Sequence, residues 1–510
     1  MRKNRLFALL CLVCTLSMLT GCWSDPPMDS MELPGQGSQE EPEEEIALPT
    51  SFALPYASDQ TLDPVTCPDG IQQTVGSLLY EGLFRLDLQL EPQPWLCRSY
   101  SYDPATFTYT FTLRSGVTFS DGSALTAADV AATLQRARTS QRYGARLAQV
   151  AAVSAGDGVV YVRLSSANTG FPALLDIPIV KSGTETSLTP VGTGPYQVSS
   201  DEEGVCLTAH TGWWAGASLP VDRIGLSSAR DRETVLYQFS SHDIQLITAD
   251  LTGTDPITAT GNISYQDADT TILQYVGINT RREPFQDAAV RQALGLGINR
   301  PTLVSAVLSG HARAAQFPVS PVSALYPAEL ETLYAYDDFS AAMEAAGLTS
   351  GQTRTVTMLV NSENSFKVAA AESIAEALSD FDLQIQVQAL PWEEYTAALA
   401  AGNFDLYYGE VKLTADWDLS ALVGTGGSLN YGGWTDPETD QLLAAYAAAG
   451  DRAAALSALC GRLLEQAPIL PVCFSTSSVL YQSGSITGLT PTMAEPFYDL
   501  GSCEIHLLEN

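Results

Sequence analysis

The sequence predicts a mixed α/β fold. Segments in which polar and apolar residues alternate, as in strands, follow segments with helix-start signals along most of the chain. The order shows no internal repeat and no long run of regular strand–helix–strand units. About 460 residues follow position 49, enough for two or three domains with a large core.

The first 22 residues carry an export signal. Three basic residues within positions 2–5 precede an apolar run at 6–18, and a small-residue ending leads into Cys22. This order is typical of a secretory signal peptide, and 13 apolar residues are too few to cross a hydrocarbon layer about 30 Å thick. The ending resembles a bacterial lipobox, which implies that residues 1–21 are removed and that Cys22 is lipidated. The alternative is an ordinary signal peptide with a chance Gly-Cys pair.

Residues 22–49 are expected to form a disordered tether. They are rich in Pro, Glu, Ser and Gly, and five glutamates lie between positions 40 and 45. Such a segment buries too little apolar surface to offset its ordering entropy, and its like charges keep it extended. A binding tail is the alternative, but no apolar residues alternate with the acids.

The charge of the chain excludes one class of partner. Removal of residues 1–21 takes away three basic residues and no acidic one, which leaves 22 basic and 58 acidic residues and a formal charge of −36. A nucleic-acid partner is therefore not expected, because phosphates need Lys and Arg. The balance favours solubility and cationic ligands. No second apolar run is long enough to span a membrane.

The cysteines leave two interpretations open. Six remain in the chain after Cys22: Cys67, Cys97, Cys206, Cys460, Cys473 and Cys503. Disulfides are compatible with export, and six cysteines allow 15 connectivities. Buried thiols used as small apolar side chains are the equal alternative.

Regular elements are predicted in the following order. They are a strand over 106–113, a helix opened by Thr126, a hairpin of 150–155 and 159–164 around Asp157-Gly158, a helix over 287–298 that ends before Pro301, a helix over 366–381, a strand over 383–390, and a helix that starts at 436–438.

Catalytic and metal-binding motifs are not found in the sequence. The four histidines do not occur in HxxxH or HExxH spacing, the chain after Cys22 has no CxxC, and neither GxSxG nor GxxxxGK[ST] occurs. We therefore expect no metal site, no cofactor and no enzymatic activity.

A series of short motifs carries a family resemblance. They are Tyr80–Phe84 (YEGLF), Ser101–Pro104 (SYDP), Gly116–Gly122 (GVTFSDG), Leu125–Val130 (LTAADV), Gly192–Tyr196 (GTGPY), Gly212–Gly216 (GWWAG), Val290–Leu294 (VRQAL), Ile298–Arg300 (INR), Ala345–Leu348 (AAGL), Trp392, Phe404–Asp405 and Asp436–Glu438 (DPE). Together, over about residues 50–505, they resemble the family 5 extracellular solute-binding proteins. That family includes the oligopeptide-, dipeptide- and nickel-binding lipoproteins of ABC importers. Asn299 stands where the family usually has Asp.

The resemblance implies a two-lobed fold like that of periplasmic binding proteins, with a hinge and an extra domain inserted in the first lobe. Lobe one would comprise residues 50–86, 189–271 and 480–510, the inserted domain 87–188, and lobe two 272–479. The hinge strands would lie near 272–279 and 479–483, and both segments are apolar and β-prone. Ligand would bind in the cleft, and hinge closure would bury it.

The implied function is that of a substrate-binding lipoprotein of an ABC importer. It would capture peptides in the interlobe cleft and deliver them to permease and ATPase subunits, which supply the ATP-driven step. It would be a monomer held by its lipid on the extracytoplasmic face of the bacterial cell membrane. The alternatives are the same fold binding a nickel chelate or an oligosaccharide, and an extracellular peptidase.

Asp416 is the main candidate ligand residue. A bound peptide's ammonium needs a carboxylate partner, and peptide-binding family members place an Asp for it after the Phe-Asp strand. The matching segment here is 414–418, and Asp418 is a rival in the same segment. Alternatively, both acids cap a helix that begins near Leu419.

Six further residues are candidate ligand contacts: Trp392, Tyr408, Glu410, Lys412, Asn430 and Tyr431. Trp392 matches a tryptophan that lines the side-chain pocket in the family, and a core tryptophan is the alternative. Strand alternation would place Tyr408, Glu410 and Lys412 on one side of a strand. An exposed pair between Glu410 and Lys412 is the alternative there.

Overall fold

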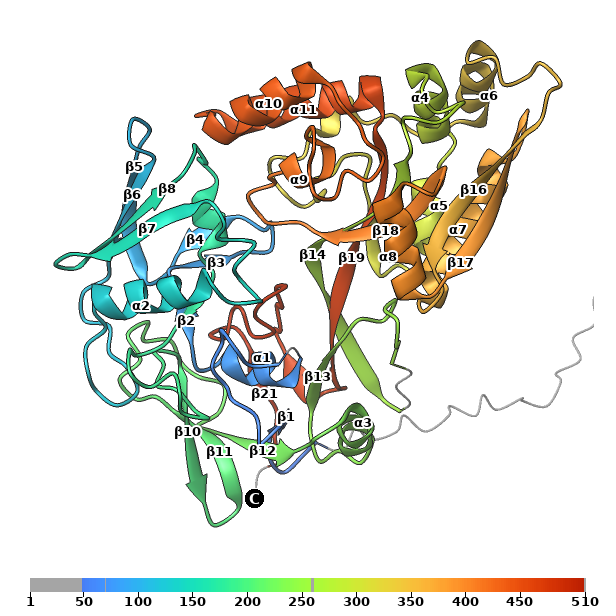
Figure 1. Cartoon of the computed structure of the whole chain (residues 1–510). Helices are drawn as coiled ribbons and strands as arrows, with labels where there is room; N and C mark the ends of the chain where they lie inside the picture. The colour runs from blue at the N-terminus through green and yellow to red at the C-terminus, as the bar shows by residue number, and fades with distance from the viewer. Residues whose placement is uncertain (1–47, 69, 258–260, 509–510) are drawn as a thin grey trace, which may run out of the picture. The chain divides into compact units, whose positions relative to one another are not determined.

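A computed structural model describes residues 48–508, apart from residue 69 and residues 258–260 (Figure 1). The predicted signal peptide 1–21, Cys22 and the tether up to residue 47 lie outside the described residues.

Lobe one contains a four-stranded sheet. Its strand order is β1 (Ala53–Tyr56), β12 (Arg223–Ser228), β11 (Gly204–Ala209) and β10 (Tyr196–Asp201). Phe52, Leu54, Leu207 and Ile224 are almost fully buried in the core of this lobe, and α1 (Ile71–Gly76) contacts β1. The short pair β20 (Ile486–Thr487) and β21 (Glu504–Ile505) contributes to the same core through Ile486.

The inserted domain is a second four-stranded sheet covered by one helix. Its strand order is β5 (Cys97–Asp103), β6 (Thr108–Leu113), β8 (Val159–Leu164) and β7 (Val150–Ala155). The helix α2 (Ala127–Ala137) packs on β7 and β8. The predicted strand and hairpin are confirmed. The helix start is confirmed too, because Thr126 and Asp129 bond each other's backbone N–H in a capping box.

Two smaller pairs join the inserted domain to lobe one. They are β2 (Glu81–Gly82) with β9 (Pro178–Ile179), and β3 (Phe84–Leu86) with β4 (Pro92–Pro94). The 3₁₀ turn Phe171–Leu174 contacts β3.

A seven-stranded sheet runs from lobe one into lobe two, with β13 (Leu246–Ala249) at its lobe-one end. Its strand order is β13, β19 (Ile469–Gln482), β14 (Ile263–Ile278), β18 (Leu406–Lys412), β16 (Arg354–Asn361) and β17 (Leu383–Leu390), and β15 (Ala312–Ala314) also pairs with β19. The helix α7 (Ser365–Leu378) packs on β16 and β17, and α8 (Trp392–Ala401) contacts β16. The predictions for 366–381 and 383–390 are confirmed.

The remaining helices pack around this sheet or on one another. They are α3 (Arg232–Ser240), α4 (Ala288–Leu296), α5 (Arg300–Ala306), α6 (Tyr336–Ala345), α9 (Ser420–Val423), α10 (Pro437–Ala448) and α11 (Arg452–Gln466). Asp436 caps α10 as predicted, and Asn299 caps α5, so an Asn serves here where the family usually has Asp. In the described part of the chain, no helix combines the length and hydrophobicity of a membrane span.

The two long strands β14 and β19 run antiparallel and connect the lobes (Figure 1). In β19, residues up to Phe474 pack in the cores of lobe two and residues from Val479 pack in lobe one. In β14 the register with β19 shifts between Asp269 and Leu273. In both strands, the point at which side chains pass from the core of one lobe to that of the other therefore lies slightly before the predicted hinge positions, 272–279 and 479–483.

No disulfide links the six cysteines of the described chain, and all six are buried. The second of the two predicted interpretations, buried thiols packed as small apolar groups, describes this structure.

Glu81 holds three family motifs together. Its buried carboxylate accepts hydrogen bonds from the indole N–H groups of Trp95 (2.8 Å), Trp213 (3.0 Å) and Trp214 (2.9 Å). Thr193 Oγ1 donates a fourth at 2.7 Å. Burial raises the pKa of Glu81, while these four donors lower it. The network joins β2 to the GTGPY and GWWAG segments.

The glycines of the GTGPY segment allow its backbone to lie close to that of Leu79. A Cβ at Gly192 would lie 2.0 Å from the carbonyl oxygen of Leu79, and one at Gly194 would lie 2.6 Å from the carbonyl carbon of Leu79. A side chain at either position would push the backbone away from Leu79, and with it Thr193 away from Glu81.

We expect Glu81→Gln to lower the free energy of unfolding by about 2–4 kcal/mol, because an amide NH₂ would face indole donors in a buried site. Thr193→Val, which removes one donor of four, should cost about 1–2 kcal/mol. Urea unfolding of the two single variants and the double variant tests the network. Fully additive losses would show that Glu81 and Thr193 are not coupled, which would contradict the network.

Candidate functional site

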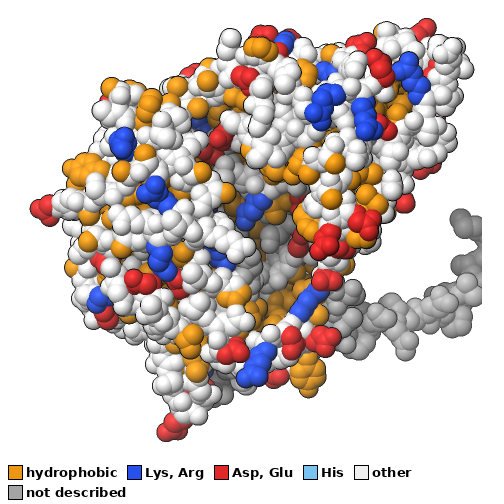
Figure 2. Space-filling model, in the orientation of Figure 1, with side chains coloured by type: hydrophobic (Ala, Val, Ile, Leu, Met, Phe, Trp, Pro, Cys, Tyr) orange, Lys and Arg blue, Asp and Glu red, His pale blue; other side chains and the backbone are white. Residues whose placement is uncertain are grey.

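A cavity of about 380 Å³ lies between lobe one, the inserted domain and lobe two. Its described lining comes from residues 62–76, Leu86, residues 142–178, Thr271, residues 412–415, and the pair Met493 and Ala494. Figure 2 shows this face of the described chain hollowed, with Lys and Arg side chains inside the hollow. The volume lies within the range of small-molecule sites.

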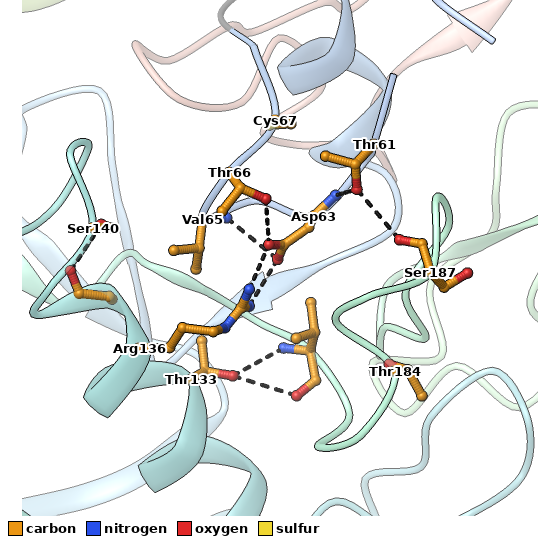
Figure 3. Close-up of polar contacts among 12 residues, drawn as sticks. Thr61, Asp63, Val65, Thr66, Cys67, Thr133, Arg136, Ser140, Thr184 and Ser187 are labelled. Carbon is orange, nitrogen blue, oxygen red and sulfur yellow. Dashed lines mark hydrogen bonds and ion pairs between the residues drawn. The ribbon is translucent and has the colours of Figure 1, made fainter. Parts of the chain in front are cut away.

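The lobe-one wall is fixed by a buried ion pair (Figure 3). Asp63 is fully buried, and both of its carboxylate oxygens accept from the guanidinium of Arg136 on α2, at 2.5 and 2.7 Å. Thr66 Oγ1 donates to the same carboxylate at 2.7 Å, and Thr61 Oγ1 donates to the carbonyl of Ser187 at 3.3 Å. Bidentate Arg–carboxylate pairs constrain orientation strongly, so the segment that carries Leu62 and Pro64 is held to the inserted domain.

The inserted-domain wall carries two arginines. Arg146 forms an ion pair with Asp176, and both line the cavity. Burial lowers the pKa of Arg146 to about 10, so its guanidinium stays charged at neutral pH. Arg142 also lines the cavity and donates to the carbonyl of Cys67 in the opposite wall.

The third wall follows the end of β18. Lys412 pairs with Ile272 of β14 in the sheet register, and Leu413 to Ala415 continue the lining. The hydroxyl of Thr271 donates to the carbonyl of Leu413 at 2.6 Å, and the N–H of Leu413 donates to the carbonyl of Thr271 at 2.9 Å. This wall is therefore attached to the strands that connect the lobes.

The charge of the cavity is opposite to that of the chain. Among its described lining residues, Arg142, Arg146 and Lys412 are basic and Asp176 is the one acid, whereas the whole chain has 58 acidic and 25 basic residues. Clefts lined by one sign of charge concentrate ligands of the opposite sign. Within the described residues, no group of three His, Cys, Asp or Glu side chains could hold a metal ion.

A second contact joins the inserted domain to lobe two beside this cavity. Asn168 Nδ2 donates to Asp416 Oδ2 at 2.8 Å, and Thr169 donates to the carbonyls of Ala447 and Ala449 at 2.9 and 2.8 Å. Gly170 lies against this contact, and a Cβ there would come within 2.5 Å of a guanidinium nitrogen of Arg452.

Asp416 is buried in that contact. Its carboxylate accepts from Asn168 and from Thr414 Oγ1, and its carbonyl accepts from Tyr446 Oη and Arg452 Nη2. Burial raises the pKa of Asp416, while the bonds from Thr414 and Asn168 lower it. Its neighbour Ala415 lines the cavity, although Asp416 itself is turned to protein partners.

Of the other predicted ligand residues, Lys412 lines the cavity, and the rest lie apart from its lining. Asp418 accepts from the N–H of Ser420 at 2.9 Å and from Gln149 at 3.4 Å. No side chain caps α9, whose N-cap residue is Leu419, so the capping alternative is wrong for Asp418 and Asp416. Tyr408 is buried in a lobe-two core and donates to Gln274 at 2.7 Å. Their ligand roles stay predictions.

The remaining three groups also have structural surroundings. Glu410 pairs with Lys367 at 3.0 Å rather than with Lys412, and Trp392 is 55% exposed, so it is no core residue. Asn430 braces its own loop through Gly424 and Trp434, and the Tyr431 ring contacts Tyr407 edge-on.

The arginines of the cavity were missed because they lie in irregular chain after α2 and belong to no motif. A compositional signal was present. Residues 136–146 contain four arginines in a chain that has only 25 basic residues among 510. The segment around Leu62–Gln73 offered no comparable signal.

Comparison with known proteins places this geometry in a family. The model of "Bacterial extracellular solute-binding proteins, family 5 Middle" matches residues 91–430, which is more than half of the chain. The chain belongs to the family 5 extracellular solute-binding proteins. Proteins of this family bind solutes for ABC importers in transport, and the relatives found are not enzymes.

Individual relatives are distant but cover most of the chain. The glutathione-binding protein GsiB of Escherichia coli K12 is 27% identical over 391 residues, which are 72% of this chain and 76% of that protein. An unliganded open form of the murein tripeptide-binding protein MppA has a TM-score of 0.74 at 19% identity, over 90% of this chain and 98% of that one. A nickel ABC transporter protein of Bacillus halodurans also has a TM-score of 0.74, at 20% identity, over 90% of this chain and 100% of that one. These structures share the two-lobed fold.

Proposed function

We propose that this protein captures short peptides that carry acidic groups and delivers them to the permease and ATPase subunits of an ABC importer. The observation that carries the proposal is the cationic cavity, which is bounded by both lobes and the inserted domain. A peptide's backbone can pair with strand edges whatever its sequence. The charge of the cavity can then select among peptides by the charge of their side chains. Arg142, Arg146 and Lys412 would bind ligand carboxylates.

The size of the cavity and the nature of the relatives support a small ligand. A volume of about 380 Å³ is at the lower end of small-molecule sites. Relatives with the same fold are named for glutathione and for a murein tripeptide.

A carboxylate-chelated metal is the second candidate, and the same cations favour it. One relative of the same fold is a nickel ABC transporter protein. Because no described cluster of protein ligands could hold a bare ion, a metal would have to enter with its own carboxylate chelator.

The ligand class can be tested by native mass spectrometry of protein purified without refolding, followed by calorimetry with Ala-Glu-Ala and Ala-Lys-Ala. We expect co-purified peptides and preferential binding of the acidic tripeptide. Lys412→Gln should weaken that binding about tenfold or more, because a charge-assisted bond is lost. Lys181→Gln is the matched control, since Lys181 pairs with Asp121 away from the cavity lining. Equal binding of both tripeptides, or a single co-purified metal chelate or sugar, would contradict the peptide proposal.

We propose further that Asp416 receives the peptide's ammonium when ligand displaces the amide of Asn168. Asp416 is buried and adjoins the cavity through Ala415. In the exchange its carboxylate would lose the neutral amide donor of Asn168 and gain the charged ammonium, which is the stronger donor. Removing one partner of a buried pair costs about 3–5 kcal/mol, so Asp416→Asn should reduce peptide affinity on the order of a hundredfold. An N-acetylated peptide should bind wild type poorly and the variant no worse.

Calorimetry with free and acetylated peptide separates the outcomes. If Asp416→Asn and Asn168→Ala weaken both peptides alike, Asp416 acts only in the contact between the inserted domain and lobe two. If Asp418→Asn alone weakens the free peptide, the ammonium role belongs to Asp418.

Anchoring completes the proposal. We propose that the mature protein begins at Cys22, carries a lipid there, and works as a monomer at the extracytoplasmic face of the cell membrane. Residues 22–49 would serve as its solvated spacer. The support is the order of basic residues, apolar run and small-residue ending before Cys22.

Cys22→Ala should abolish lipid labelling and release the protein from the membrane fraction. The measurement is metabolic labelling with a fatty acid, followed by fractionation. Unchanged labelling in the variant would refute the anchor, and Cys67→Ala is the matched control because that cysteine is buried in the folded domain.

A further inference from the structure

Two buried arginines of lobe two differ in how completely their donors are used. Arg291 is 2% exposed, and its Nε, Nη1 and Nη2 all donate to backbone carbonyls, those of Gln466, Phe285 and Gln286. Its guanidinium also lies over the Trp434 ring, at 5.2 Å from the centroid. Every nitrogen of this guanidinium therefore has a protein partner.

Arg300 is 7% exposed and uses only part of its guanidinium. Its Nε donates to the carbonyl of Pro471 at 2.8 Å, and Nη1 donates to the carbonyls of Gly295 and Ile298 at 3.2 and 3.3 Å. Within the described residues, Nη2 has no acceptor and no carboxylate lies within ion-pair distance of the side chain. The carbonyls satisfy hydrogen bonds without forming an ion pair, and the carboxylate that acts on Arg300 from a greater distance, that of Glu331, already accepts from Tyr326 Oη.

Arg300 lines a cavity of about 290 Å³ that is separate from the cleft. Apolar groups dominate its described lining, among them Leu296, Phe317, Leu463, Leu464 and Leu470. Arg300 is the one charged residue in that lining. Gln292 and Gln316 also contribute, but their amide nitrogens already donate to the carbonyls of Glu465 and Thr332.

A buried cation at the wall of an apolar cavity is complementary to one kind of molecule. An apolar body would replace water against the leucines and Phe317, and a carboxylate would accept from Nη2 and neutralise the guanidinium. A neutral apolar molecule would leave the charge uncompensated, and a small inorganic anion would leave the apolar wall wet.

We propose that this cavity on lobe two is a second binding site, for a small organic monoanion with an apolar body, anchored by Arg300. The site shares no described lining residue with the cleft cavity. It is therefore independent of the peptide-binding proposal.

The probe for the test is 3-phenylpropionate, and 3-phenylpropan-1-ol is its neutral analogue. Calorimetry and NMR titration of the intact folded protein at neutral pH and low salt should show saturable binding of the carboxylate. The alcohol should bind about tenfold or more weakly, because it cannot make the charge-assisted bond to Arg300.

Gly295→Leu tests the location of the site and leaves the Arg300 side chain unmutated. Gly295 lies in α4 and lines the cavity, and a Cβ there would meet only Leu470, at 3.3 Å. A leucine side chain would fill the cavity, and helix propensity favours it over glycine. Binding of 3-phenylpropionate should fall about tenfold or more. Gly461→Leu in α11 is the matched control, because its Cβ would meet only Leu330, at 3.9 Å, outside the cavity lining.

Three outcomes would overturn the proposal. The first is no binding of the carboxylate by wild type at 10 mM, which is about the highest useful probe concentration for a specific site. The others are equal affinity for the alcohol and unchanged affinity in Gly295→Leu. Arg300→Gln is a further check where the variant folds, and retained affinity in that variant would remove the anchor role. Peptide binding in the cleft should be unaffected by the probe and by Gly295→Leu.

Discussion

A single buried carboxylate sets the geometry of lobe one and its inserted domain. Glu81 faces four donors, of which Thr193, Trp213 and Trp214 lie more than 100 residues away in sequence and Trp95 lies 14 residues away, and each donor belongs to a segment with little regular structure of its own. Carboxylates are acceptors only, so the site can be satisfied by donors alone. The indoles of Trp95 and Trp214 also pack edge-on, with ring centroids 5.0 Å apart. Hydrogen bonding and aromatic packing thereby fix the same backbone arrangement.

The cleft cavity is bounded by a different kind of interaction. The walls of the cleft cavity are held by ion pairs, Asp63 with Arg136 and Arg146 with Asp176, rather than by a continuous apolar core. Charged groups kept in a site that ligand must enter are costly to bury, and the surrounding fold has to supply that free energy. The cores of the two lobes and the Glu81 network are the parts of the structure that can do so.

Local patterns predicted the elements well. The strand over 383–390 and the hairpin strands 150–155 and 159–164 have the predicted bounds, because alternation and turn residues determine such elements locally. The residues of the family motifs serve packing: Glu81, Thr193, Arg291 and Asn299 all satisfy protein groups. The crossing between lobes fell a few residues from its expected place, because β14 and β19 continue as strands through it and sequence alone shows no boundary.

The site was harder to predict than the fold. A cavity wall is made from residues that the chain brings together only after folding, such as Arg142, Thr271 and Met493, and no local period marks them. Asp416 was predicted from its chain position, yet its partner Asn168 lies 248 residues away and could not be identified from spacing. Charge density was the one usable local signal, in the arginines of residues 136–146.

The contact of residues 168–170 with lobe two has a kinetic consequence. Asn168, Thr169 and Gly170 join the inserted domain to lobe two without any ligand. These protein contacts therefore supply part of the free energy that favours the closed state before a ligand binds. A population of empty, closed molecules is then expected, and a ligand can enter only the open fraction. Apparent affinity and association rate both fall in proportion to that fraction.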